Sequence, residues 1–266
     1  MTDANLRVRL DPLNPGQFFA CCGLFELLSM EEPGLLSCFA LDPQKPRKAY
    51  FCIHSASGPE RLGRVLGQLR HATATFPNEN VELPIRPAVI AFGKRRLDID
   101  WWLDEFLKDT TNIKCWAGNV KTRGLLADLL PRLDVGSTCD DLFERPASTN
   151  KLFGVDPRSA WNTLDLGFSP DAHEVLSTVF PAVEVLAAVG LQYFRPDSRN
   201  RAKVPYSLWN EPLPASIARL AFLAPWDGLQ CTNLLFEICK RGQSYKYFSF
   251  ARRAEKELFG DPQFEP

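Results

Sequence analysis

Apolar and polar residues alternate near the start of the chain, over residues 6–10 (Leu-Arg-Val-Arg-Leu). A period of two residues predicts a strand with one buried face. Asn14 and Pro15 follow and indicate a helix start, because Asn caps free backbone N–H groups and Pro suits the first helical position. Apolar residues then recur at helical spacing up to the Pro-Gly pair at positions 33 and 34, which ends the predicted helix.

The next segments predict two short strands, a second helix and one more extended stretch. The expected elements are strands over 35–41 and 48–54, a helix over 57–69, and an edge segment over 81–90 that contains two prolines. Strand, helix, strand, strand, helix, strand is the order of the ferredoxin-like fold, which many RNA-binding, RRM-like modules share. We therefore predict an α/β (α+β) protein whose N-terminal half is ferredoxin-like.

The rest of the chain predicts a helical insertion and then a second α/β half. Residues 97–133 have helical apolar spacing, whereas 134–159 is polar and rich in turn-forming residues. A helix that starts at Ser169-Pro170 is expected to be divided at Pro181, and residues 204–208, 217–223 and 245–250 are expected to return to sheet. The predicted organisation is a ferredoxin-like region with its helical extension at 1–133, a loop or boundary at 134–159, and a C-terminal α/β region with a basic surface at 160–266.

The amino-acid composition mainly excludes classes of protein, such as membrane-spanning and disulfide-rich ones. The 266 residues are 45% hydrophobic and 24% charged with a formal net charge of −1, so no global field steers the protein toward DNA or a membrane. No apolar run reaches the roughly 18 residues of a membrane span, and the first ten residues contain no apolar signal core. The eight cysteines lie mostly in apolar runs, where free cysteine behaves as a small hydrophobe. We expect a cytoplasmic protein with no membrane partner, no disulfide framework and no cofactor.

Charge is distributed unevenly along the chain. Residues 195–257 contain eleven Lys and Arg against six Asp and Glu. This excess predicts an anionic partner near the C-terminal end, although a helix with one solvated basic face has the same composition. The candidate nucleic-acid-binding residues form three clusters, which are Lys94, Arg95 and Arg96; Arg195, Arg199, Arg201 and Lys203; and Lys240, Arg241, Tyr245, Lys246, Arg252 and Arg253.

The last cluster brings cations and aromatic residues together over 245–253. Cations follow the phosphates of a single strand, and exposed aromatic faces stack its bases. The competing interpretation is a core strand with Tyr247 and Phe250 buried, followed by a surface helix, and we favour the core for these two rings. For the loop around Arg199 we favour phosphate contact, because an ordered core seldom needs four cations in nine residues.

The sequence contains no recognisable catalytic motif of the common kinds, since HExxH, CxxC, Walker A, GxGxxG and GxSxG patterns are missing. The best enzymatic candidate is the pair Asp98 and Asp100, whose carboxylates share one face of a strand and suit Mg²⁺ for phosphodiester cleavage. We favour the alternative that one of them caps a helix beginning at Trp101. We therefore predict that the protein is not an enzyme and retain a metal-dependent nuclease as the alternative.

Several blocks of this sequence resemble one CRISPR-associated family. The longest are residues 14–27 (Asn-Pro-Gly-Gln-Phe-Phe-Ala-Cys-Cys-Gly-Leu-Phe-Glu-Leu) and 206–214 (Tyr-Ser-Leu-Trp-Asn-Glu-Pro-Leu-Pro). Shorter blocks lie between them in order, at 101–102, 116–118, 165–170, 181–187 and 190–196. Together they resemble the third Csb family of type I-G systems, formerly called I-U, whose members are also described as small Cas8-like subunits.

The resemblance implies a non-catalytic subunit of a type I RNA-guided surveillance (Cascade-like) ribonucleoprotein complex in antiviral defence. Its implied partners are CRISPR RNA, target DNA and other CRISPR effector subunits, because base pairing reads sequence while protein supplies backbone contacts. A purely structural protein–protein adaptor remains a further alternative. Within the first block, Gly16 and Gly23 lie in a predicted helix, where each costs about 0.5–1 kcal/mol relative to Ala. We therefore predict a tightly packed neighbour beside this helix.

Overall fold

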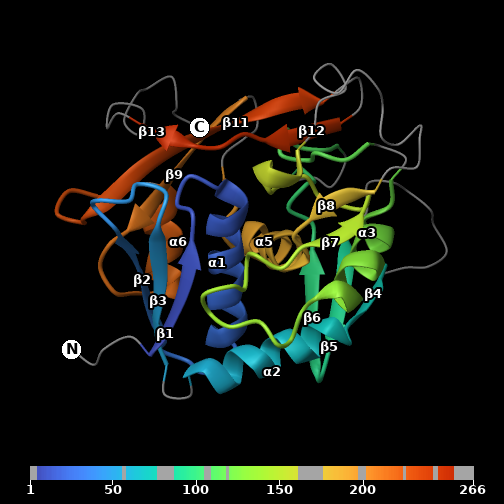
Figure 1. The fold of residues 1–266 in the computed structure, drawn as a ribbon, viewed down its shortest axis with the longest axis horizontal. Helices are drawn as coiled ribbons and strands as arrows, with labels where there is room; N and C mark the ends of the chain where they lie inside the picture. The colour runs from blue at the N-terminus through green and yellow to red at the C-terminus, as the bar shows by residue number, and fades with distance from the viewer. Residues whose placement is uncertain are drawn as a thin grey trace.

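The computed structural model describes residues 5–55, 58–76, 87–104, 109–117, 120–160, 176–196, 202–223, 226–241 and 245–254. The predicted α+β class is confirmed, because helices pack against several antiparallel sheets (Figure 1). The first sheet has the strand order β1-β3-β2-β10, with β1 (Leu6–Leu10), β2 (Leu36–Leu41), β3 (Ala49–His54) and β10 (Leu213–Pro214). As predicted, the three apolar residues of β1 are buried and the two arginines between them are exposed.

Helix α1 (Pro15–Ser29) runs through the middle of the molecule (Figure 1). The backbone N–H of Gln17 donates to Asn14 Oδ1 at 3.2 Å, and Pro15 lies at the first helical position, so the predicted helix start is confirmed. Every residue from Pro15 to Leu28 is buried. A helix that is apolar on all sides needs neighbours on all sides, and α1 therefore organises the core around itself.

The closest neighbour of α1 is helix α5 (Pro181–Tyr193), which begins at the predicted proline. A Cβ atom added to Gly23 would overlap the backbone carbonyl oxygen of Leu186, and one added to Gly190 would overlap that of Phe19. A Cβ on Gly16 would likewise lie 2.6 Å from the carbonyl oxygen of Val155. The prediction that Gly16 and Gly23 face tightly packed neighbours is confirmed.

The extended segment expected to complete a ferredoxin-like sheet pairs elsewhere. Strands β4 (Thr73–Thr75), β5 (Ala88–Phe92) and β6 (Arg95–Ile99) form a separate antiparallel sheet after helix α2 (Gly58–Arg70). Residues 81–86 of the predicted strand lie outside the described residues. The ferredoxin-like arrangement of the N-terminal half is therefore not confirmed.

Only part of the segment 97–133 is helical. Leu97 and Ile99 are buried on β6 with exposed Asp98 between them, a two-residue period that belongs to a strand. The helix predicted to begin at Trp101 is wrong, because Trp101 and Trp102 lie in a turn where their rings pack edge to face. Among the described residues of this segment, the helical part is α3 (Thr122–Leu129), which continues into the 3₁₀ turn η1 (Leu130–Arg132).

The C-terminal sheet is built on the long strand β11 (Cys231–Arg241). Strand β9 (Lys203–Trp209) pairs with one edge of β11, and β12 (Tyr245–Phe248) and β13 (Arg252–Arg253) pair with the other. The strands predicted over 204–208 and 245–250 are confirmed in β9 and β12. The strand predicted over 217–223 is wrong, because this segment is helix α6 (Ala215–Leu223), with Ala218, Ala221 and Phe222 buried at helical spacing.

One hydrophobic cluster connects both halves of the chain, from Leu6 to Ala251. The segment predicted as a loop or boundary contributes Phe143 and Phe153 to it, and also holds β7 (Ala147–Thr149) and η2 (Pro157–Ser159). Strand β7 pairs with β8 (Ser177–Val179). The helix predicted to start at residue 169 lies outside the described residues up to residue 175, and its predicted continuation to Pro181 is wrong, because Ser177–Val179 form β8. In the part of the chain that the structure describes, no helix is long and apolar enough to cross a bilayer.

Candidate nucleic-acid interface

The register of the C-terminal sheet separates an inner from an outer face. Phe236 and Leu234 of β11 are buried opposite Val204 and Tyr206 of β9, so this side faces the core. Because successive side chains of a strand alternate, Glu237 lies on the other side, opposite Lys203. Leu235 lies on the same outer side and is buried, and we call the other outer residues Lys203, Glu237, Cys239, Tyr247 and Arg252 the C-terminal face.

Cations predominate on and around the C-terminal face. Lys203, Lys240, Arg252 and Arg253 are all exposed, and the carboxylate of Glu237 lies 3.6 Å from Arg252 Nη2. An ion pair this exposed contributes little to stability, so Arg252 is available to a phosphate at small cost. Of the third predicted cluster, Arg252 lies on the C-terminal face, whereas Lys240 and Arg253 are at strand positions of the other side, paired with Lys246 and Leu234.

The aromatic residues of the segment 245–250 lie partly in the core and partly on the surface. Phe248 is fully buried on the inner face, whereas Tyr247 is half-buried on the C-terminal face. The expectation that Phe250 is buried is wrong, because its side chain is 41% exposed beyond the end of β12. The guanidinium of Arg47 lies 4.7 Å from the centre of the Phe250 ring, a distance typical of a cation–π contact.

A second basic surface, which the sequence prediction missed, lies on the first sheet next to the turn that contains Arg47. Arg7 and Arg9 lie on the outer side of the first sheet, and the Arg7 guanidinium is 4.7 Å from the centre of the Tyr50 ring. Lys48 approaches the same ring, with Nζ 5.3 Å from its centre. The alternation of arginines in β1 was the available signal for this surface. We call it the N-terminal face and define it as Arg7, Arg9, Lys48 and Tyr50.

The first predicted cluster lies on the hairpin between β5 and β6, on the opposite side of the molecule from β11–β13 (Figure 1). Two of its three cations already have partners. Arg95 donates to the carbonyl oxygen of Met30 at 3.2 Å, and Arg96 donates to Asp98 Oδ1 at 3.1 Å. Lys94 is exposed at the turn. The structure therefore does not bring this cluster to the C-terminal face.

The second predicted cluster is only partly described. Arg199 and Arg201 lie outside the described residues. Arg195 forms an ion pair with Asp100, whose Oδ1 also accepts from Gln192 Nε2 at 3.0 Å. This arrangement joins α5 to the end of β6, so Arg195 has a structural function here.

The two aspartates considered for metal binding each pair with an arginine, Asp98 with Arg96 and Asp100 with Arg195. Their side chains thus have a structural explanation that needs no metal. Among the described residues, no group of three or more His, Cys, Asp or Glu side chains is arranged to hold a metal ion.

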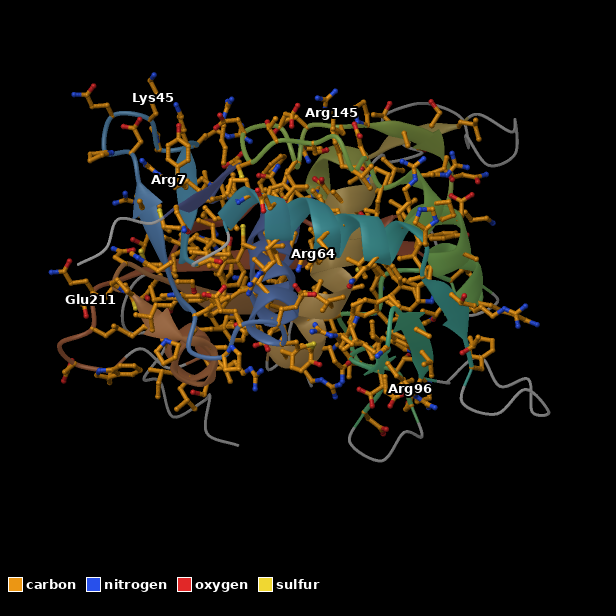
Figure 2. All side chains as sticks on the ribbon, turned by 90° about the horizontal axis from the view of Figure 1, so that it is seen from below. Arg7, Lys45, Arg64, Arg96, Arg145 and Glu211 are labelled. Atoms are coloured by element: carbon orange, nitrogen blue, oxygen red, sulfur yellow. The ribbon has the colours of Figure 1, made fainter. Side chains whose placement is uncertain are left out.

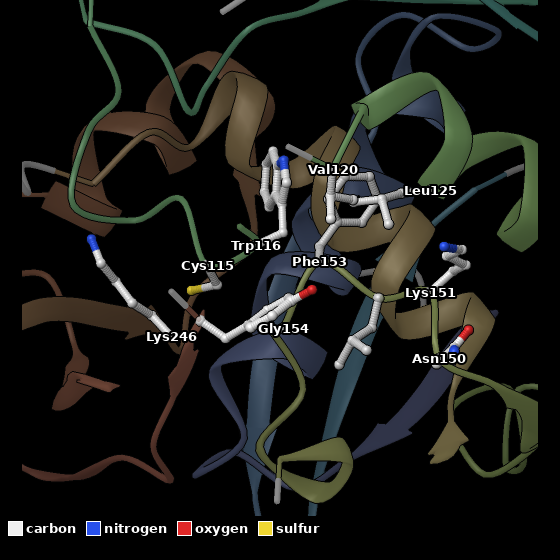
Figure 3. Close-up of a pocket in the computed structure, with 11 residues that line it drawn as sticks. Cys115, Trp116, Val120, Leu125, Asn150, Lys151, Phe153, Gly154 and Lys246 are labelled. Carbon is white, nitrogen blue, oxygen red and sulfur yellow. The ribbon is translucent and has the colours of Figure 1, made fainter. Parts of the chain in front are cut away.

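Beside β12, three segments of the chain enclose a pocket of about 200 Å³ (Figure 3). The backbone N–H of Lys246 donates to the carbonyl oxygen of Cys115 at 2.8 Å, and that of Phe248 donates to the carbonyl oxygen of Gly154 at 3.1 Å. These bonds tie β12 to the two loops that complete the pocket. Lys246, predicted to contact nucleic acid on the surface, is half-buried here, and its Nζ donates to the carbonyl oxygen of Asn112 at 3.3 Å. Nothing is described of the Arg241 side chain.

A buried carboxylate fixes the loop that carries Gly154. Glu184 Oε2 accepts from the backbone N–H groups of Phe153 at 2.6 Å and Gly154 at 3.1 Å, and Oε1 accepts from that of Asp156 at 3.3 Å. Burial raises the pKa of Glu184 to about 8, and the neighbouring carboxylate of Asp156 adds to the shift. Nothing in the sequence signalled this contact, because the partners are about thirty residues apart.

We expect the free energy of unfolding to depend differently on pH in the wild type and in the Glu184→Gln variant. An acid whose pKa is raised in the folded state stabilises the fold when protonated, and that contribution disappears as pH rises from about 4.5 to about 8. The free energy of unfolding of the wild type should therefore fall relative to that of Glu184→Gln by several kcal/mol, at about 1.4 kcal/mol per pKa unit. Urea denaturation across this pH range measures the difference, and parallel curves for the two proteins would contradict the assignment.

Comparison with known proteins finds no matching family model, no matching curated protein and no matching solved structure.

Proposed function

We propose that this protein is a non-catalytic subunit of a type I RNA-guided CRISPR surveillance complex, in which it contacts the backbone and bases of a nucleic-acid strand. The observation that carries the binding part is the C-terminal face, where exposed Lys203 and Arg252 flank Tyr247 on one side of an antiparallel sheet. Cations beside aromatic rings are the two components that single strands require.

The placement of this protein in a CRISPR complex rests on its sequence. The blocks over 14–27 and 206–214 resemble the type I-G Csb family, and the first block is helix α1. Within the proposal, β1, α1, β2 and β3 are the RRM-like part of the fold, and guide RNA and target DNA are the partners in the cytoplasm.

A subunit also needs a surface for its neighbours, and α6 offers one. Leu220 is 60% exposed, and Leu223 and Trp226 are each 46% exposed. Leu220 and Leu223 lie three residues apart on α6 and so share one side of the helix, and clustered exposed apolar side chains commonly mark protein interaction sites. We propose that another effector subunit covers them.

Reconstitution tests the proposed complex. The tagged protein is co-expressed with a CRISPR array and the candidate effector subunits, and the RNA that remains bound after purification is sequenced. We expect repeat-derived guide RNA and stoichiometric effector subunits. As a matched pair, Leu220→Glu should lose the subunits, whereas Val135→Glu, at another exposed apolar position, should retain them. Purification of the wild type without guide RNA or subunits would refute complex membership.

A further inference from the structure

Two cysteines lie directly opposite each other on the outer side of the first sheet. Cys38 on β2 is the register partner of Cys52 on β3. Their neighbours along the two strands, Phe39 and Phe51, are buried, and the ring centres of these phenylalanines lie 4.7 Å apart in the core. Because successive side chains of a strand point to opposite faces, Cys38 and Cys52 both point away from the core. Both are free thiols.

The positions of these two residues suit a disulfide bond that is easily reversed. Directly opposite residues of antiparallel strands have Cα atoms about 4.5 or 5.5 Å apart, and both values lie within the roughly 4.4–6.8 Å that disulfides span. Their Cβ atoms are typically about 4.5–5.5 Å apart, slightly wider than the roughly 3.5–4.5 Å of a relaxed disulfide. A bond at this place is therefore strained, and strained disulfides are the labile, regulatory ones.

Cys139, another cysteine near this sheet, is separated from the pair by β1. The carbonyl oxygen of Cys139 accepts from the backbone N–H of Arg9 at 3.0 Å, whereas β3 pairs with the other edge of β1. Two strand spacings, about 9–10 Å, lie between Cys139 and Cys52, which is too far for a bridge. The remaining cysteines lie elsewhere, Cys21, Cys22 and Cys115 in the core and Cys231 and Cys239 on β11.

Cys52 has the surroundings of a reactive cysteine. Arg7 on β1 is its register partner on the side away from Cys38, and the Arg7 guanidinium lies 4.7 Å from the ring centre of Tyr50, two residues before Cys52 on the same side. A hydrogen bond from the Cys38 thiol lowers the pKa of Cys52 to about 7 against the effect of burial, and the charge of Arg7 lowers it further. A thiolate beside an arginine is the form of cysteine that attacks oxidants.

The exposure of the pair favours a small oxidant. Cys52 is 6% exposed and Cys38 is half-buried. A contact area with solvent this small suits hydrogen peroxide, which is little larger than water, better than a bulky disulfide such as oxidised glutathione. Cys38 lies where a second thiol is needed to turn the first oxidation product into a disulfide.

We propose that Cys38 and Cys52 form a reversible dithiol–disulfide site that reacts with hydrogen peroxide. The Cys52 thiolate attacks one peroxide oxygen, so that an S–O bond forms, the O–O bond breaks and the departing hydroxide takes up a proton to become water. Cys38 Sγ, which loses its proton, then attacks Cys52 Sγ. The S–S bond forms, and the hydroxyl group leaves with that proton as a second water. The two thiols lose two electrons and the peroxide gains them.

The disulfide would change the N-terminal face, and this inference does not depend on the proposed function. It joins β2 to β3 within one hairpin and replaces a thiolate beside Arg7 by a neutral group. Arg7 then has one negative neighbour fewer, so the basic surface around it becomes more positive.

Peptide mapping of the folded, full-length wild type tests the proposal. The reduced protein is treated with hydrogen peroxide, the remaining thiols are alkylated, and the peptides are analysed by mass spectrometry without reduction. We expect Cys38 and Cys52 to be joined, two of the eight thiols to be lost, and both to return with dithiothreitol. Retention of all eight thiols at peroxide concentrations that oxidise free cysteine, or a bridge between other cysteines, overturns the proposal.

Cys38→Ser separates the two chemical steps. Without a second thiol, Cys52 should stop at the sulfenic acid, which dimedone labels as an added mass on the peptide that contains Cys52. Cys239→Ser, which removes a half-buried cysteine opposite Tyr247, is the matched control and should form the Cys38–Cys52 bridge at the wild-type rate. Dimedone on other cysteines but not on Cys52 would contradict the assigned order of attack.

Arg7→Met distinguishes a reactive pair from two cysteines that only lie close together. Without the guanidinium the pKa of Cys52 rises, so the rate of bridge formation at neutral pH should fall severalfold. Arg9→Met, two residues along β1 and opposite Tyr50, should keep the wild-type rate. Circular dichroism checks that both variants are folded. Equal rates in the wild type and both variants would show that Arg7 does not activate Cys52.

Discussion

Gly190→Ala is expected to abolish the native fold or to lower the free energy of unfolding by more than about 4 kcal/mol, the range of the most severe core substitutions. A methyl group at this position would overlap the carbonyl oxygen of Phe19 on α1. The obstacle is backbone and not a flexible side chain, so α1 and α5 must move apart. Since both helices are almost entirely buried, such a shift would open the core along its length.

Gly63→Ala and Gly67→Ala on α2 are the matched controls for this prediction. No heavy atom lies within 4 Å of a Cβ added to either residue. Each should stabilise the protein by about 0.5–1 kcal/mol, because Ala favours the helix over Gly. Chemical denaturation followed by circular dichroism measures all three variants. A Gly190→Ala protein with wild-type stability would contradict the close packing of α1 and α5.

Phe18→Ala is the second variant with a large expected effect, a loss of about 3–5 kcal/mol for removing a fully buried ring. The Phe18 ring lies 5.5 Å from that of Phe39 on β2, 4.6 Å from Tyr206 on β9 and 5.9 Å from Phe222 on α6. It therefore joins the first sheet to the C-terminal sheet within one aromatic cluster. Phe250→Ala, which removes an exposed ring, should change stability by less than about 0.5 kcal/mol.

The number of unfolding transitions shows whether the two predicted regions of the chain fold together. Because one core includes residues from both predicted regions, we expect wild type and Phe18→Ala each to unfold in a single transition, measured by tryptophan fluorescence and far-UV circular dichroism together. Two separated transitions in Phe18→Ala, with one half of the protein retaining its wild-type midpoint, would instead favour independent folding of the regions 1–133 and 160–266.

Local signals predicted the first part of the fold well. Asn14 and Pro15 fix the start of α1 through a capping hydrogen bond, and the alternation over 6–10 fixes the buried side of β1. Pairing between distant strands has no such local signal, which is why the segment 81–90 was expected to complete a ferredoxin-like sheet, whereas β5 pairs with β4 and β6. Helix α6 was mistaken for a strand because a short apolar run fits either period until its neighbours are known.

The candidate site was harder to predict, because the partners of charged residues are set by tertiary structure. Arg195 looked free in the sequence, yet it pairs with Asp100, ninety-five positions away. Arg95 and Arg96 are likewise engaged on β6 and its neighbours. Lys246 was predicted to lie on the surface, yet its Nζ donates to the carbonyl oxygen of Asn112, 134 positions away. Among the exposed cations on β9 and β13, Lys203 and Arg252 are at strand positions that face outward.

Affinity for single-stranded RNA as a function of NaCl concentration tests the central claim most directly. Wild type is compared with Lys203→Ala/Arg252→Ala/Arg253→Ala, with Arg7→Ala/Arg9→Ala/Lys48→Ala, and with the control Arg64→Ala/Arg70→Ala/Lys94→Ala, whose three cations are exposed away from the C-terminal sheet (Figures 1 and 2). Fluorescence anisotropy is recorded with and without Mg²⁺, using RNA, single-stranded DNA and duplex.

The account predicts that the first triple variant binds RNA more weakly than wild type. The slope of log affinity against log NaCl concentration should be shallower by about 2, because each lost phosphate contact on a single strand contributes about 0.7 to this slope. The second variant shows whether the N-terminal face also contacts the bound RNA. The control variant should bind RNA as the wild type does. If the first variant and the control bind with the same affinity and salt slope as wild type, the C-terminal face is not a nucleic-acid interface.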